Sequence, residues 1–218
     1  MKIFIIIKHN SQRIKKKNFL NINGFPLWEF FLKKFKKKDQ VYIDTDSSEV
    51  FNSGKIKFKN FIFYKREKKF IDYENRGVKS PVLMMIKNFL LKHVDNDNEI
   101  IITTHITSPF IKRSTILDAV KKLGKNEFVH STTYHQEFAW LKTKNKFKKI
   151  NFGKNVKKTQ NLDPILFSNG AFFIFKKKSF LKYSNRLGKK NFFYKINFPE
   201  SFELDNKNDI KIMKNILK

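Results

Sequence analysis

The sequence contains no cysteine, which excludes disulfide bonds, thiolate metal ligands and a cysteine nucleophile. Glycine and proline are scarce, with seven and five residues. No apolar run approaches the roughly 20 residues of a membrane-spanning helix, so we expect no membrane partner. The apolar start Met1–Ile7 lacks the basic flank and the small-residue cleavage site of a signal peptide, which favours a cytoplasmic location.

Acidic residues are also few, since 19 Asp and Glu accompany 47 Lys and Arg, and the net charge is +28. Such an excess can indicate nucleic-acid binding. Only five of the basic residues are arginine, however, and residues with A/T-rich codons (Lys, Asn, Ile and Phe) make up more than half of the chain. Proteins that bind phosphate backbones usually also use arginine, for its bidentate fork. We therefore favour a compositional bias and predict no nucleic-acid partner, with DNA binding through the Lys-rich surface as the alternative.

What remains is the composition of a folded chain. With 218 residues, 40% of them hydrophobic, and 26 Phe, the sequence predicts one domain over 1–218. Apolar runs typical of strands alternate with amphipathic stretches typical of helices. The predicted strands are 2–7, 41–43, 61–64, 99–104, 128–132, 165–168, 171–175 and 192–196. The predicted helices are 26–35, a short one starting at 47–51, 82–94, 114–123 and 210–217.

This alternation predicts an α/β fold with a mostly parallel sheet and helices on both faces. In such sheets, ligands bind beyond the carboxyl ends of the strands. Polar segments follow three of the predicted strands, at Lys8–Asn18, Asp44–Ser47 and His105–Pro109. The alternation stops after Trp140, which predicts an arm at about 138–168.

The segment Lys8–Asn18 directly follows the first predicted strand and combines Asn and Ser groups with several cations. A loop at this place can wrap a polyphosphate with its backbone N–H groups, aided by Lys or Arg. It contains no glycine, so it matches neither the Walker pattern nor the dinucleotide fingerprint. From the loop alone, phosphate binding and a solvated basic loop are equally favoured.

Six short motifs follow one another along the chain: Ser11-x-Arg13-Ile14-x-x-Lys17-Asn18, Gly24-x-Pro26-Leu27, Ile43-Asp44-Thr45-Asp46, Thr107-Ser108-Pro109, Asn169-Gly170-Ala171 and Glu203-Leu204-Asp205. This ordered set resembles the acylneuraminate cytidylyltransferase family, over residues 3–217. The resemblance implies a Rossmann-like nucleotidyltransferase fold of the nucleotide-diphospho-sugar transferase type, with a small arm that forms a homodimer. It also implies transfer of CMP from CTP to an acidic 2-keto-3-deoxy sugar of the sialic-acid (nonulosonate) kind, with Mg²⁺ as cofactor and pyrophosphate as by-product.

The resemblance assigns the nucleotide to the loop and its neighbours. The implied nucleotide-binding residues are Lys8, Asn10, Ser11, Lys17, Asn18, Arg66 and Asn75. Lys8, Lys17 and Asp205 are implied to act in catalysis, the lysines by neutralising the β- and γ-phosphates. Lys8 stands where the family usually has arginine, so it keeps the charge and loses the bidentate geometry.

The implied sugar-binding residues are His105, Thr107, Lys158, Gln160 and Asn169. Thr159 stands where many members have an arginine near the substrate carboxylate, so we expect Lys158 or Gln160 to take over that contact.

Glu203 and Asp205 correspond to the family's metal-binding pair. Residues two apart on a strand point to the same face, so both carboxylates can converge on one Mg²⁺. Asp209 is expected to cap the final helix, near Ile210.

Two alternatives to a sialic-type acceptor stay open. The same chemistry on a 3-deoxy-octulosonate or another sugar acid is one. A non-catalytic nucleotide- or sugar-binding homologue is the other, because Lys8 and Thr159 depart from the family pattern. Sugar-1-phosphate nucleotidyltransfer is disfavoured, because the glycine-rich phosphate loop of those enzymes is missing here.

Overall fold

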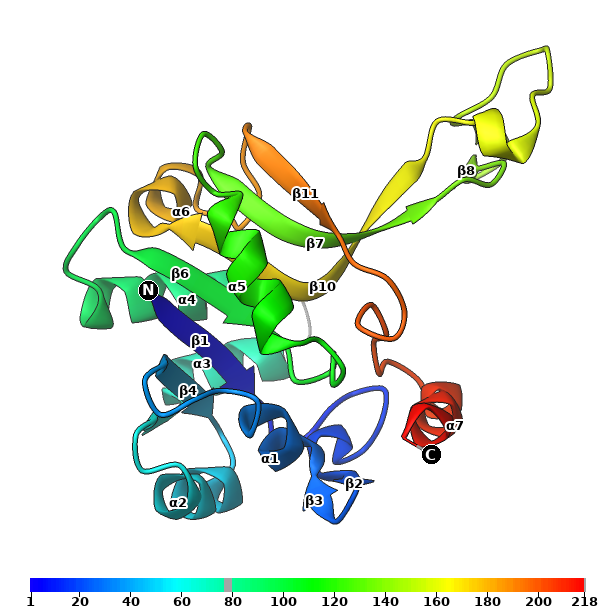
Figure 1. The fold of residues 1–218 in the computed structure, drawn as a ribbon. Coiled ribbons are helices and arrows are strands. Elements are labelled where there is room, and N and C mark those ends of the chain that lie inside the picture. Colours follow the sequence, from blue (N-terminus) through cyan, green and yellow to red (C-terminus); the bar gives the residue numbers. More distant parts are fainter. Residues whose placement is uncertain (77–79, 218) are drawn as a thin grey trace.

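The computed structural model describes residues 1–76 and 80–217, and a seven-stranded sheet forms its centre (Figure 1). In spatial order the strands are β11 (Asn191–Lys195), β7 (Phe128–His135), β10 (Ile165–Lys176), β6 (Ile100–Thr104), β1 (Lys2–Ile7), β4 (Gln40–Thr45) and β5 (Ile62–Lys65). Neighbouring strands are parallel except at β10, which runs antiparallel to both β6 and β7. The predicted mostly parallel α/β sheet is confirmed.

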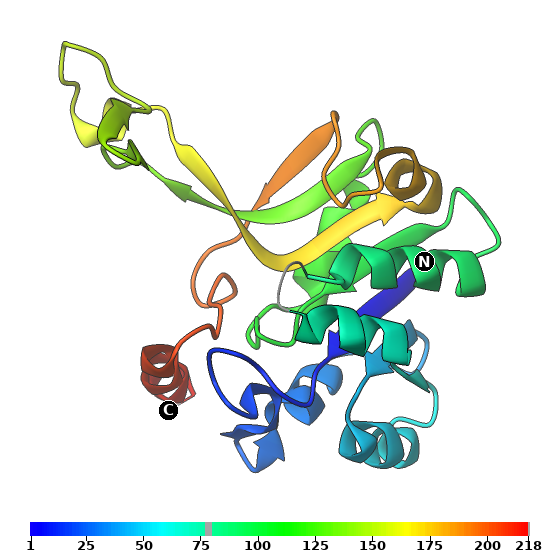
Figure 2. The same ribbon diagram turned by 180° about the vertical axis from the view of Figure 1, so that it is seen from behind.

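Helices cover both faces of this sheet. They are α1 (Leu27–Leu32), α2 (Ser48–Lys57), α3 (Lys68–Asn75), α4 (Val82–His93), α5 (Arg113–Lys121) and α6 (Lys177–Tyr183), whereas α7 (Lys207–Ile216) lies apart from the sheet (Figure 1). Trp28 of α1, Val50 of α2 and Ile116 of α5 pack in one core. Phe89 of α4 and Phe180 of α6 pack in the core on the other face, and Figure 2 shows α3 beside α4 there. Within the described residues, no helix is long and apolar enough to cross a bilayer.

Strand β1 is buried on both faces of the sheet, which explains its continuous apolar run. Ile3, Ile5 and Ile7 lie in the first core and Phe4 lies in the second, because side chains alternate across a strand. All four are at most 2% exposed. The chain therefore becomes polar where β1 leaves the sheet, and Lys8 is the first residue beyond its carboxyl end.

A third, smaller core joins the loop after β1 to the C-terminal segment. Ile14 and Ile22 contribute from the N-terminal part of the chain. Leu204, which precedes α7, and Met213 of α7 contribute from the C-terminal part. A short hairpin of β2 (Asn21–Ile22) and β3 (Phe25–Pro26) follows the loop and turns at Gly24, whose φ is +84°. Two segments separated by most of the chain are thereby held together at one edge of the sheet.

Two helices were not expected from the sequence. The short helix α3 is mostly polar and buries only Phe70, so no apolar run marks it in the sequence. Helix α6 begins in the lysine run at 176–178, and Lys177 reaches back to the Val94 carbonyl at 2.8 Å. Helix α1 is shorter than predicted, because Pro26 belongs to β3 and is only the N-cap.

The two strands predicted at 165–168 and 171–175 are one strand, β10. Its pairing register with β7 shifts between Ser168 and Phe173, around Gly170, whose φ is +74°. The half of β10 before this shift runs into an arm that projects from the sheet (Figure 1). The arm also carries the hairpin β8 (Trp140–Thr143) and β9 (Lys146–Lys149) and the 3₁₀ turn η2 (Thr159–Asn161).

Candidate active site

A cleft of about 380 Å³ lies at the carboxyl ends of β1 and β6. Segments far apart in the sequence line it: the loop after β1, the end of α3 at Glu74, the start of α4 at Ser80 and Val82, the turn after β6 and the stretch before α7. This is the edge at which open α/β sheets bind their ligands. The predicted site residues that border the cleft are Lys8, Asn10, Ser11, Lys17, Asn18, His105, Thr107, Glu203 and Asp205.

The loop after β1 folds back on itself without any glycine. Asn18 donates from Nδ2 to the Lys8 carbonyl at 2.7 Å, and the Lys17 N–H donates to the Ile14 carbonyl at 3.1 Å. Lys16 adopts the left-handed conformation that glycine usually supplies, with φ of 52°. Because Ile14 also anchors the loop in the third core, the loop has a defined shape. That shape favours the phosphate-binding interpretation over a freely solvated loop.

Lys17 connects this loop to the stretch before α7. Its side chain is only 9% exposed, and its Nζ donates to the Leu204 carbonyl at 2.8 Å and lies 3.5 Å from Asp205 Oδ1. Burial lowers the pKa of Lys17, while the charge of Asp205 acts in the opposite direction. An ammonium group and a carboxylate therefore stand side by side in the wall of the cleft.

The prediction that Glu203 and Asp205 lie on a strand is wrong, because the stretch before α7 is an irregular extended segment. Leu204, between them, packs in the third core, and its N–H donates to the Thr107 carbonyl at 2.8 Å. This anchor leaves both flanking carboxylates bordering the cleft. The two groups share the cleft as predicted, although the third core and not a sheet brings them there.

The start of α7 fixes the backbone beside Asp205. Asn206 is the N-cap, and Asp209 Oδ2 accepts from the N–H groups of Asp205 at 2.7 Å and of Asn206 at 2.8 Å. Together they form a capping box, a reciprocal pair of bonds at a helix start. The expected capping role of Asp209 is confirmed, with Asn206 as its partner.

The carboxylate pair has the character of a site for a hard cation. Burial raises the pKa of Glu203 to about 7, and the charge of Asp205 adds to that effect. Mg²⁺ is typically bound by one or two protein carboxylates, with water and phosphate oxygens filling its other positions. Glu203 and Asp205 fit this ligand set. Among the described residues, no group of three or more His, Asp or Glu offers a metal site made by the protein alone.

Two charged residues of the cleft were missed as site residues. Arg13 lies with its NH2 atom 2.8 Å from Asp205 Oδ1, and Glu74 of α3 pairs with the ammonium group of Lys8. Arg13 stands inside the first motif and could have been proposed from it, whereas Glu74 lies on the helix that the sequence did not reveal. The cations of the cleft thus have carboxylate partners that an incoming polyphosphate would have to replace.

Arg66 lies behind the cleft. Its fully buried side chain donates from Nε to Asp44 Oδ1 at 2.7 Å, and its NH1 atom lies 3.3 Å from Asp46 Oδ2. Burial raises the pKa of Asp44 to about 6, against the opposing effect of Arg66. Asp46 in turn accepts from the His9 N–H at 2.7 Å, so Arg66 supports the loop after β1. Direct contact of Arg66 with a nucleotide stays a prediction.

A second hollow of about 570 Å³ continues along the same loop. Asn10 and Ser11 border both hollows, and Asn75 at the end of α3 borders the second. The structure therefore places Asn75 beside the loop after β1, as predicted. The two hollows together offer room for a ligand that extends along the loop.

His105 and Asn169 lie near each other at the sheet edge. A methyl group built on Gly170, the neighbour of Asn169, would stand 3.6 Å from His105 Nδ1 and 3.9 Å from Glu203 Oε1. Asn169 Nδ2 is buried and has no hydrogen-bond partner in the described part of the chain. A buried donor without a partner is costly, but Asn169 is not among the residues that line the cleft, so its contact with a sugar stays a prediction.

Lys158 and Gln160 do not join these residues within one chain. Both are exposed and lie at η2 on the arm, beyond the sheet (Figure 1). The Gln160 carbonyl accepts from Gln136 Nε2 at 3.4 Å, which holds this turn against the end of β7. Counting along the sequence could not show that this segment is carried away from the cleft.

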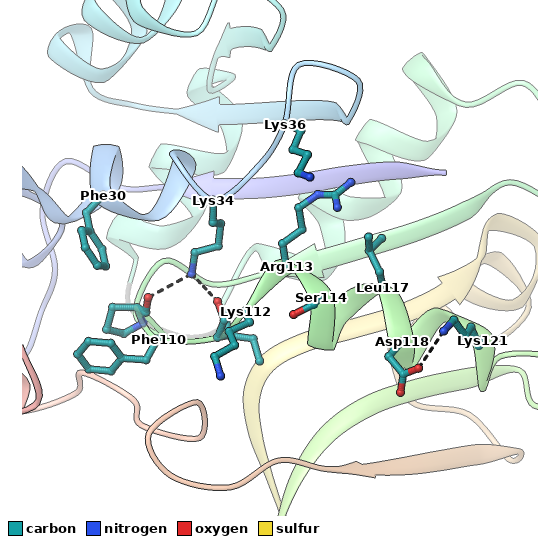
Figure 3. A pocket seen from close by; sticks show the side chains of 12 residues that line it. Phe30, Lys34, Lys36, Phe110, Lys112, Arg113, Ser114, Leu117, Asp118 and Lys121 are labelled. Atoms are coloured by element: carbon teal, nitrogen blue, oxygen red, sulfur yellow. Dashed lines mark hydrogen bonds and ion pairs between the residues drawn. The ribbon is translucent and has the colours of Figure 1, made fainter.

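A larger hollow, of about 780 Å³, lies elsewhere, between α1 and α5 (Figure 3). Lys34 crosses its wall and donates from Nζ to the carbonyls of Pro109 at 3.1 Å and Ile111 at 2.7 Å. Burial lowers the pKa of Lys34 to about 7. This hollow lacks the paired carboxylates of the smaller cleft. Its Lys34 holds the segment that follows Thr107 by hydrogen bonds to two backbone carbonyls.

Comparison with known proteins assigns this architecture to a family. A sequence model of the cytidylyltransferases matches residues 3–217. The chain belongs to this cytidylyltransferase family. A curated relative, the 3-deoxy-manno-octulosonate cytidylyltransferase of Wigglesworthia glossinidia brevipalpis, is 30% identical over 136 residues. That match takes in 61% of this chain and only about half, 51%, of the relative's length.

Solved structures share the cytidylyltransferase fold at low identity. A CMP:2-keto-3-deoxy-manno-octonic acid synthetase complexed with CTP matches with a TM-score of 0.63 and 12% identity, over 98% of this chain and 97% of that one. A 4-diphosphocytidyl-2C-methyl-D-erythritol synthase from Anaerococcus prevotii matches with a TM-score of 0.64 and 13% identity, over 99% and 95%. The nucleotidyltransferase fold implied by the sequence motifs is confirmed, whereas a sialic-type member of the family is not singled out.

Proposed function

We propose that this cytidylyltransferase couples CTP to the anomeric hydroxyl of a 2-keto-3-deoxy sugar acid, with Mg²⁺ as cofactor, to give a CMP-sugar and pyrophosphate. The observation that carries the proposal is Lys17, which stands between the loop after β1 and Asp205 in the cleft. This contact joins a cationic loop suited to phosphates to a carboxylate pair suited to a divalent cation.

The residues of the cleft divide the work in this reaction. Lys8 and Lys17 would neutralise the phosphates that leave as pyrophosphate, after Lys8 exchanges Glu74 for a phosphate oxygen. Asp205 and Glu203 would hold Mg²⁺, which supplies positive charge to the α-phosphate when bound. The hydroxyl oxygen of the sugar forms a bond to the α-phosphorus and its proton passes to solvent, while the bond from that phosphorus to the pyrophosphate oxygen breaks and pyrophosphate leaves. The protein chiefly positions these groups and stabilises spreading negative charge.

An octulosonate-type acceptor is the better first candidate. The curated relative is named as acting on 3-deoxy-manno-octulosonate, and a sialic-type acceptor has no comparable support. The fold does not decide the acceptor, because related folds serve different ones. The sialic-type nonulosonates therefore become the second group to assay.

Pyrophosphate release from Mg·CTP measured against a panel of acceptors tests this proposal. The panel contains 3-deoxy-octulosonate, nonulosonates and, as a comparison that has a phosphate but no carboxylate, a methylerythritol phosphate. We expect release with a 2-keto-3-deoxy acid and CMP attached to the sugar in the product. Binding of Mg·CTP by calorimetry without release from any acceptor would favour the non-catalytic alternative.

The raised pKa of Glu203 predicts how Mg²⁺ binding depends on pH. A carboxylic acid must lose its proton to hold the metal, so the pKa of about 7 means that protons compete with Mg²⁺ below neutrality. We expect the Mg²⁺ affinity of the CTP complex to rise between pH 6 and pH 8, by up to about tenfold per unit below the pKa. Calorimetric Mg²⁺ titrations at several pH values measure this. Glu203→Gln is the control, because in this variant only the protonation of CTP itself still changes with pH. An equal dependence of the Mg²⁺ affinity on pH in both proteins would contradict the assignment of Glu203.

We also propose that two chains associate through the arm. Large apolar side chains on it are more than half exposed: Trp140, Leu141, Phe147, Ile150 and Phe167. Apolar surface of this kind usually marks an interface, and a two-fold dimer is the commonest assembly. Within one chain, Lys158 and Gln160 lie away from the cleft. In such a dimer, they could reach the cleft of the other chain.

The double substitution Trp140→Asp with Phe147→Asp is expected to convert the dimer to a monomer, because charges would enter an apolar contact. Sedimentation velocity at micromolar concentration measures the change. Ile56→Asp, at a side chain 72% exposed on α2, is the matched control and should leave the dimer intact. A wild-type monomer, or a double variant that stays dimeric, would contradict the arm interface.

A further inference from the structure

His105 has different neighbours on the two nitrogen atoms of its ring. On one side, a methyl group built on Gly170 would stand 3.6 Å from Nδ1, and the same methyl would stand 3.9 Å from Glu203 Oε1. On the other side, Nε2 lies 3.2 Å from NH1 of Arg186, which comes from the segment between α6 and β11. His105 itself borders the cleft. The imidazole thus lies between the surroundings of Gly170 and an arginine that the sequence did not single out.

Arg186 is held firmly in this place. The carbon atom of its guanidinium lies 4.1 Å from the centre of the Phe173 ring, so the group stacks on an aromatic face. Burial lowers the pKa of Arg186 to about 10, which still leaves it cationic near neutral pH. No carboxylate pairs with it in the described part of the chain. Its hydrogen bond to His105 is therefore its principal polar contact there.

The chemistry of the two groups fixes the proton on the histidine. A guanidinium has only N–H donors and no acceptor, so His105 Nε2 must accept in this contact. The proton of a neutral imidazole then belongs on Nδ1. Burial, and next the charge of Arg186, lower the pKa of His105 to about 3, so the ring is neutral.

We propose that Arg186 is a positioning residue that holds His105 in the Nδ1–H tautomer, so that His105 donates a hydrogen bond toward the cleft beside Glu203. Where the proposed function holds, the partner is a lone-pair oxygen of the sugar acid, such as its carboxylate or hydroxyl oxygen. At this point the enzyme thus recognises the sugar acid through an oxygen atom that accepts a hydrogen bond. Arg186 acts on it through His105 and not by direct contact.

The tautomer can be observed directly, whether or not the enzyme turns over. In protein labelled with ¹⁵N and ¹³C at histidine, the two neutral tautomers give distinct ring signals at neutral pH, and His105→Asn identifies the signals of His105. We expect the Nδ1–H form in the wild type and in Arg186→Lys, which keeps a cationic donor. We expect Arg186→Met and Arg186→Leu, which have no donor, to shift the ring toward the Nε2–H form. Arg76→Met, at an exposed arginine, is the matched control and should change nothing.

Kinetics with the active acceptor supply the second readout. Asparagine carries its amide nitrogen where His105 carries Nδ1, whereas glutamine carries it one bond further, near Nε2. We therefore expect His105→Asn to keep the acceptor KM within a few fold, and His105→Gln and Arg186→Met to raise it about tenfold, with the KM for CTP nearly unchanged. This is the size of effect that loss of one hydrogen bond gives.

Three results would overturn the proposal. The first is an Nε2–H or doubly protonated His105 in the wild type, and the second is an Nδ1–H tautomer that persists in Arg186→Met. The third is an equal rise in the KM for CTP and in the KM for the sugar acid in Arg186→Met. A wild-type protein that releases no pyrophosphate with any sugar acid refutes the proposed function instead, and the ring signals still decide the role of Arg186. If Arg186→Met does not fold, Arg186→Leu and Arg186→Lys provide the same comparison.

Discussion

Asp205→Asn is expected to lower the rate of CMP-sugar formation by about 10²–10³-fold, or about 3–4 kcal/mol in the barrier. The carboxylate of Asp205 faces the cleft between Arg13, at 2.8 Å, and Lys17, at 3.5 Å. The amide keeps the size of the side chain and removes the charge that would hold Mg²⁺. Pyrophosphate release at saturating CTP and acceptor measures the loss, and circular dichroism confirms that the variant folds.

Asp95→Asn is the matched control, because it removes the same charge from an exposed position after α4. It is expected to have wild-type turnover. If Asp205→Asn also kept near wild-type turnover, the metal assignment of this carboxylate would be refuted. Partial recovery of the Asp205→Asn variant at high Mg²⁺ would support that assignment, because a weakened site is filled by mass action.

The centre of the fold was predictable because its strands are buried on both faces. In β1, Ile3, Phe4 and Ile5 point into opposite cores, so the run is apolar without interruption and cannot be mistaken for a surface segment. The same reasoning located the site, since the first polar residues after β1 and β6 must lie at the sheet edge. Lys8 and His105 both border the cleft there.

The stretch before α7 shows where periodicity misleads. Phe202 and Leu204 alternate with Glu203 and Asp205, which is the pattern of a half-buried strand. The two apolar side chains pack in the third core against the loop after β1, and no sheet partner exists in the described structure. An alternating pattern reports that one side is buried and does not report what buries it.

Residues whose role depends on a distant neighbour were beyond sequence reasoning. Arg186 lies in an irregular segment with no pattern of its own, and its meaning comes from contact with His105, 81 positions earlier. Conversely, Lys158 and Gln160 were assigned to the sugar by position along the chain. Their place on the arm follows from the course of β7 and β10, which local sequence does not encode.

Lys17→Met is expected to reduce kcat/KM for CTP by about 10²–10³-fold, because a cation positioned in the wall of the cleft is lost. The substitution also removes the donor to the Leu204 carbonyl. A buried carbonyl without a partner costs about 1–3 kcal/mol, so the free energy of unfolding should fall by that amount. Steady-state kinetics with varied CTP and chemical denaturation measure the two effects separately, and calorimetric titration with Mg·CTP adds the binding affinity.

Lys15→Met tests whether position or total charge matters. Lys15 belongs to the same loop and is exposed, so its removal lowers the net charge of +28 by the same unit. If the excess of lysine attracts CTP only as a general field, both variants lose the same small amount of affinity, and added salt removes the difference from the wild type. If Lys17 binds the phosphates, its variant loses far more than Lys15→Met, at low and at high salt. Equal affinities would contradict the assignment of Lys17 and leave the lysine excess as the only source of attraction.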